Sequence, residues 1–139
     1  CAITTIENYE KRIPIARENF IRAEKEEQIT LLEGDAKDVL ETLTEPFDLI
    51  FMDAAKGQYL NFLPRVLELL QPEGILISDN VLQDGDIIES RFAVTRRNRT
   101  IHKRMREYLY TLTHSEELTT AVLPVGDGIT ISTKKGRKA

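Results

Sequence analysis

The chain has 139 residues, of which 41% are hydrophobic and 30% charged, a balance typical of one soluble domain with its own buried core. The formal net charge of -4 argues against indiscriminate nucleic-acid binding, and the single cysteine, Cys1, excludes an internal disulfide and a cysteine-based metal cluster. No apolar run approaches the roughly 20 residues of a membrane helix and no signal-peptide pattern is present, so we expect a cytoplasmic protein without membrane contact.

The first predicted elements are a strand at Ala2–Ile6 and a helix at Asn8–Glu27. Apolar residues recur in this helix near helical spacing, at Ile13, Ala16, Phe20 and Ile21. Glu7 stands at the carboxyl end of the strand, where dinucleotide-binding folds use a carboxylate to bind ribose hydroxyls. The alternative is a solvated side chain. Because the sequence opens directly in a strand and without Met, we expect residues 1–139 to be one N-terminally truncated domain.

A second strand is predicted at Gln28–Leu32, followed by a tight turn and a short helix through Leu43. Gly34 permits the turn, and Asp35 suits the N-cap of the helix. The alternative to capping is a binding role, in which Asp35 and the backbone of Ala36 meet the edge of an adenine.

Two further apolar runs of strand character follow, ending at Asp53 and at Asp79-Asn80. Between them we predict a helix at Gly57–Leu70, with a buried stripe of Leu60, Leu63, Leu67 and Leu70. The alternation of strands and helices predicts an α/β fold with a parallel sheet and right-handed crossovers.

Polar side chains end these two strands. In open α/β sheets, the carboxyl edge of the strands is where ligands bind, so we expect Asp53, Asp79 and Asn80 to converge there. Two carboxylates and an amide suit a hard divalent cation such as Mg²⁺. Lys56, three residues beyond Asp53, is expected to reach the same pocket.

A basic segment without acidic residues lies between residues 91 and 106. Its cations are Arg91, Arg96, Arg97, Arg99, Lys103, Arg104 and Arg106. One interpretation is a solvated helix face, and the other is a groove for phosphates. The helix is predicted to end near His114, and both His102 and His114 lack metal-ligand spacing, so we interpret them as surface or structural residues.

The last predicted elements are strands at Leu118–Leu123 and Gly128–Ser132, joined by the turn sequence P-V-G-D-G. This turn predicts an antiparallel hairpin at the end of the sheet.

Three motifs together resemble the cation-dependent O-methyltransferases that use S-adenosylmethionine, the group of catechol and caffeoyl-CoA O-methyltransferases. They are D-L-I-F-M-D-A-A-K-G-Q-Y, G-I-L-I-S-D-N-V and P-V-G-D-G-I. Within this group, the segment R-R-N-R-T-I-H-K-R-M-R-E-Y is most similar to the bacterial tRNA 5-hydroxyuridine methyltransferases. The resemblance implies a Rossmann-like class I methyltransferase sheet, mostly parallel with a C-terminal antiparallel hairpin. The family's first strand and its glycine-rich turn are not found before Cys1.

The resemblance also implies roles for individual residues. Mg²⁺ would be held by Asp53, Asp79 and Asn80, with Asp53 also near the methionine part of S-adenosylmethionine. The ribose would be bound by Glu7, the adenine lined by Gly34, Asp35 and Ala36, and catalysis carried by Lys56. A homodimer is a further expectation, because the family is often dimeric.

The activity implied is methyl transfer to a hydroxyl beside a second oxygen, most specifically 5-hydroxyuridine in tRNA bound by the basic segment. One alternative is a small-molecule, catechol-type substrate. The other is a fragment that binds nucleotides or oligomerises without catalysis.

Overall fold

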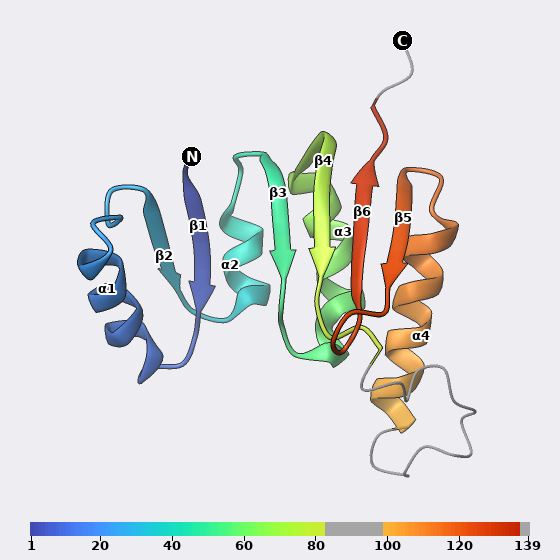
Figure 1. Cartoon of the computed structure of the whole chain (residues 1–139), viewed down its shortest axis with the longest axis horizontal. Helices are drawn as coiled ribbons and strands as arrows, with labels where there is room; N and C mark the ends of the chain where they lie inside the picture. The colour runs from blue at the N-terminus through green and yellow to red at the C-terminus, as the bar shows by residue number, and fades with distance from the viewer. Residues whose placement is uncertain (83–98, 137–139) are drawn as a thin grey trace. The chain divides into compact units, whose positions relative to one another are not determined.

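The computed structural model describes residues 1–82 and 99–136. The chain divides into two compact units, Cys1–Thr44 and Glu45–Ala139. Each unit has its own sheet (Figure 1).

The first unit is a parallel strand pair with two helices. β1 (Ile3–Glu7) pairs with β2 (Ile29–Glu33) in a register that runs from Ile3 opposite Ile29 to Glu7 opposite Glu33. The helices are α1 (Arg12–Arg22), which connects the strands, and α2 (Ala36–Thr42), which follows β2. The predicted β-α-β-α order of this half is confirmed.

Helix α1 is shorter than the predicted Asn8–Glu27. It ends in a Schellman motif, in which Lys25 N donates to Phe20 O at 2.9 Å and Glu24 N donates to Ile21 O at 2.9 Å. Glu24 adopts φ 55°, in the left-handed region usually left to glycine. The predicted apolar stripe is also partly wrong, since Ile21 is 61% exposed and α1 buries no residue.

The second unit is a mixed four-stranded sheet in the order β3-β4-β6-β5. Its strands are β3 (Phe47–Met52), β4 (Leu70–Ser78), β5 (Leu118–Leu123) and β6 (Ile129–Lys134). β3 and β4 are parallel, whereas β6 is antiparallel to both β4 and β5. The predicted C-terminal antiparallel hairpin at the end of the sheet is therefore confirmed.

Two helices pack against this sheet, α3 (Tyr59–Leu69) and α4 (Arg99–His114), and the short 3-10 helix η1 (Lys56–Gln58) precedes α3 (Figure 1). The core they share with the sheet is formed by Met52, Tyr59, Phe62, Leu63, Val66, Leu69, Leu76, Met105, Tyr108 and Leu112. Ser78 of β4 hydrogen bonds to Tyr108 of α4 at 2.6 Å between hydroxyl oxygens, so these two buried hydroxyls are paired between the sheet and the helix.

The buried face of α3 differs from the predicted leucine stripe. Tyr59, Phe62, Leu63, Val66 and Leu69 are buried, whereas Leu60 and Leu67 are only half-buried and Leu70 is the first residue of β4. Both sets have helical spacing, so the periodicity alone does not distinguish them. Packing against the sheet and α4 decides which face is inside.

Strand β3 has one buried and one exposed face. Leu49 is 53% exposed and Phe51 is 57% exposed, while Met52, at the end of the strand, is 6% exposed. The alternation shows that one face of β3 is covered and the other is open in this structure.

Candidate functional site

Asp53 and Asp79 lie at neighbouring strand ends. Met52 of β3 is opposite Ser78 of β4, and the next backbone amide, Asp79 N, continues the ladder by donating to Met52 O at 3.1 Å. Neighbouring strands are about 4.8 Å apart, so the two aspartates emerge side by side. The two strand ends are therefore adjacent, while convergence of the side chains on one metal ion stays a prediction.

Tyr59 lies directly beneath this edge. Its side chain is fully buried, and its hydroxyl is 2.9 Å from Asp79 O and 3.3 Å from Met52 O. The pKa of Tyr59 is raised to about 12, mainly because the hydroxyl is buried. The hydrogen bond with the Ala54 backbone opposes this shift, and the negative charges of Asp53 and Asp79 contribute to it. Sequence reasoning missed this residue, although it ends the D-A-A-K-G-Q-Y motif.

Asn80 is held in a defined conformation. It adopts φ 54°, which asparagine tolerates better than most residues, and its backbone N donates to Asp79 Oδ1 at 2.7 Å. Its side-chain Nδ2 donates to Asp127 Oδ2 at 3.0 Å. Asp127 lies in the turn between β5 and β6, and sequence reasoning did not assign it to the site.

Lys56 is the first residue of η1 and is half-buried. The turn that carries it is fastened to α4, because the Arg104 guanidinium donates to Gly57 O at 2.6 Å. One of the cations predicted to contact phosphates therefore supports the segment next to the predicted catalytic lysine.

The predicted cofactor residues of the first unit also gather at one strand edge. Gly34 N donates to Glu7 O at 3.1 Å, which joins the ends of β1 and β2. Asp35 is the N-cap of α2 and accepts a hydrogen bond from Lys37 N at 2.8 Å, so the capping interpretation is confirmed. Ala36 begins that helix. Contact with adenine stays a prediction.

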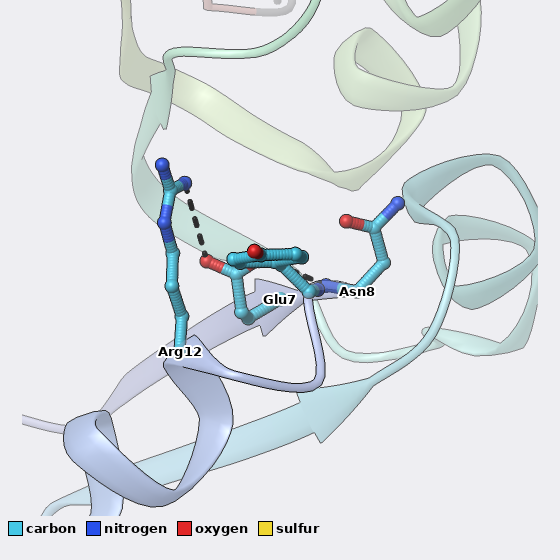
Figure 2. A network of polar contacts seen from close by, with 4 residues as sticks. Glu7, Asn8 and Arg12 are labelled. Carbon is cyan, nitrogen blue, oxygen red and sulfur yellow. Dashed lines mark hydrogen bonds and ion pairs between the residues drawn. The ribbon is translucent and has the colours of Figure 1, made fainter.

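The Glu7 carboxylate is partly engaged within its own loop. Its Oε1 accepts from Asn8 N at 3.0 Å and from Tyr9 N at 2.9 Å, and its Oε2 is 3.9 Å from the Arg12 guanidinium. Figure 2 shows the carboxylate between Arg12 and the backbone of Asn8. Oε1 thus organises the turn after β1, and ribose binding by Glu7 stays a prediction.

Only part of the basic segment is described, since Arg91, Arg96 and Arg97 lie outside the described residues. On α4, Lys103, Arg104 and Arg106 are exposed and Arg99 is half-buried. Lys103 pairs with Glu107 at 3.7 Å. His102 is 2% exposed, and the ring of His114 stacks on Tyr110. Both observations agree with the prediction that the two histidines are surface or structural residues.

The ends of β3 and β4 offer oxygen donors to a metal ion. Within the described part of the chain, no three His, Cys, Asp or Glu side chains gather as a metal cluster. The candidate ligands at the β3 and β4 ends are two carboxylates and one amide oxygen, which is a set that hard cations accept. In open α/β folds, ligands bind at the carboxyl ends of the strands, where these oxygens lie. The fold and the site therefore place the chain among the ligand-binding α/β proteins.

Comparison with known proteins identifies the family. Residues 1–135 match the family described as O-methyltransferase, so the chain belongs to this family. Caffeoyl-CoA O-methyltransferase 1 of Eucalyptus globulus is 34% identical over 131 residues, which cover 90% of this chain and 52% of that protein. Catechol O-methyltransferase of Niastella koreensis is 34% identical over 91 residues, covering 63% of this chain and 41% of that protein.

Solved structures show the same fold. A Podospora anserina methyltransferase bound to SAH is 30% identical with a TM-score of 0.84, covering 97% of this chain and 61% of that one. An O-methyltransferase of Bacillus cereus in complex with SAH is 27% identical with a TM-score of 0.83, covering 96% and 63%. The predicted methyltransferase fold is therefore confirmed. The chain spans about half the length of the plant relatives it matches.

None of the helices in the described residues has the length and apolar character required to cross a membrane.

Proposed function

We propose that the protein transfers a methyl group from S-adenosylmethionine to a hydroxyl that has a second oxygen beside it, with Mg²⁺ at the metal site. The observation that carries the proposal is the adjacent placement of Asp53 and Asp79 at the ends of β3 and β4, with Asn80 next in the chain. The relatives of Podospora anserina and Bacillus cereus that bind SAH support the choice of cofactor.

Different residues of the second unit would bind the metal, position the strand ends and accept the proton. Asp53, Asp79 and Asn80 would hold the cation by oxygen atoms, and Tyr59 keeps two of their strand ends together through hydrogen bonds to Asp79 O and Met52 O. Bound Mg²⁺ would lower the pKa of the acceptor hydroxyl, and S-adenosylmethionine would supply the methyl group. Lys56, three residues from Asp53, would accept the hydroxyl proton or stabilise the oxyanion.

In the first unit, we propose that residues at the ends of β1 and β2 contact the cofactor. Glu7 would bind a ribose hydroxyl through Oε2, because Oε1 already accepts two backbone hydrogen bonds. The turn of Gly34, Asp35 and Ala36 would line the adenine, with Asp35 retaining its cap to Lys37 N. Asp53 would also lie near the methionine part of the cofactor.

A catechol-type or caffeoyl-type small molecule is the preferred acceptor, because the named relatives act on such compounds. The test is methyl transfer to a catechol by the protein at its natural length, with Asp79→Ala as the variant and Asp48→Ala as the control. Asp48 is exposed near the other end of β3. We expect Asp79→Ala and EDTA each to abolish transfer. Activity that survives both would refute the metal-dependent mechanism.

A second candidate acceptor is 5-hydroxyuridine in tRNA, which also has a hydroxyl beside a carbonyl oxygen. It is favoured by the exposed cations of α4 and by the basic residues that precede this helix. Lys103→Glu, compared with Lys25→Glu as an exposed control of equal charge change, separates the two acceptors. If tRNA is the substrate, Lys103→Glu lowers the rate of tRNA methylation and leaves the rate of catechol methylation unchanged. Equal methylation of tRNA by both variants contradicts the tRNA proposal.

A further inference from the structure

We propose that Asp127 is a positioning residue of the metal site, which fixes the Asn80 amide so that Oδ1, and not Nδ2, faces the cation. The inference rests on the proposed metal function of Asn80. Its basis is the 3.0 Å hydrogen bond from Asn80 Nδ2 to Asp127 Oδ2.

The chemistry of the pair dictates the orientation. An ionised carboxylate only accepts hydrogen bonds, so the Asn80 group that faces Asp127 must be the NH₂ end. The amide oxygen lies on the other side of the same carbon and is directed away from Asp127. Without a partner, an amide rotates between two orientations of similar energy, and one of them presents N–H groups to a cation. Asp127 removes that unproductive orientation.

The backbone holds Asp127 in place independently of its side chain. Val81 N donates to Gly128 O at 3.0 Å, and Leu82 N donates to Asp127 O at 2.9 Å. The turn is closed on itself by Gly128 N, which donates to Val125 O at 3.0 Å. The β5–β6 turn is thus fastened to the segment that follows β4, and a change of the Asp127 side chain leaves these bonds intact.

Asn80 is equally constrained from its own side. Its φ of 54° and the bond from its N to Asp79 Oδ1 at 2.7 Å define the direction of its side chain. Val81, the next residue, is fully buried and anchors this segment in the core. Backbone hydrogen bonds thus hold both segments in place, and the freedom that the Asn80–Asp127 bond removes is the rotation of the side-chain amide.

The experiment measures Mg²⁺ affinity by calorimetry in Asp127→Ala and in the exposed control Asp48→Ala, using the protein at its natural length. Outer partners of metal ligands contribute roughly 10–100-fold to metal affinity, and we expect a loss of that size in Asp127→Ala. The control is expected to bind as the wild type does. Asp127→Asn keeps an oxygen that can accept from Asn80 Nδ2, so it should retain more affinity than Asp127→Ala.

A metal-free readout tests the orientation itself. The side-chain NH₂ signals of Asn80 in ¹⁵N NMR are expected to show a protected, fixed amide in the wild type and an exchanging amide in Asp127→Ala. Wild-type Mg²⁺ affinity in Asp127→Ala, or an Asn80 amide that is equally fixed in that variant, overturns the inference. If Asp79→Ala loses Mg²⁺ binding while Asp127→Ala retains it, only this inference fails. If the wild type itself binds no Mg²⁺, the proposed function fails as well.

Discussion

Replacing Tyr59 with Phe removes one buried hydroxyl and leaves the ring in place. The hydroxyl is 2.9 Å from Asp79 O and 3.3 Å from Met52 O, and the side chain is fully buried. Met52 O keeps its bond from Asp79 N at 3.1 Å, whereas Asp79 O loses this donor. A buried carbonyl that loses its partner costs about 1–3 kcal/mol, so we expect the free energy of unfolding to fall by that amount.

The assay is thermal or urea unfolding of the metal-free protein. At this chain length, each kcal/mol lowers Tm by about 3–6 °C. Tyr110→Phe makes the same chemical change on a side chain that is 63% exposed, and it should shift stability by less than about 0.5 kcal/mol. Equal stability of the two variants would refute the reasoning that Tyr59 joins the strand ends through its hydroxyl.

Three further predictions follow from local contacts. Asp35→Ala removes the cap of α2 and should lower the free energy of unfolding in urea by about 0.5–2 kcal/mol, whereas Asp35→Asn retains most of it. Gly128→Ala should destabilise more than Gly126→Ala in the same assay, because both have positive φ but only at Gly128 would a Cβ meet Leu82 Cγ, at 2.2 Å. Burial raises the pKa of Tyr108 above its ordinary value near 10, although its hydrogen bond to a serine hydroxyl lowers it in part. The folded state then keeps a proton that the unfolded state releases, so the free energy of unfolding is unaffected below pH 10 and falls above it, by up to about 1.4 kcal/mol per pH unit. Urea unfolding of Tyr108→Phe at pH 9 to 11, in about half-unit steps, should show a smaller fall in the free energy of unfolding above pH 10 than the wild type shows. An equal fall in both proteins would contradict the conclusion that Tyr108 ionisation contributes to it.

The candidate site was partly predictable because its residues are close in sequence to strand ends. An apolar run that stops at an acidic residue indicates where a strand delivers a side chain, and the meeting of Asp53 with Asp79 followed from that pattern. Tyr59 and Asp127 could not be found in this way. Their roles depend on contacts with residues 20 and 47 positions away.

The sequence by itself determined the α/β class, the order of the elements, the cap at Asp35 and the C-terminal hairpin. These features depend on local backbone preferences and on periodicity, which neighbouring residues carry. Only the tertiary structure decided which face of α3 is buried, that one face of β3 is open, and that the hairpin turn holds Asn80. Helical spacing allowed both faces of α3, and the amide of Asn80 allowed two orientations. In each case, the choice came from the free energy of contacts between segments distant in the chain, which local sequence does not encode.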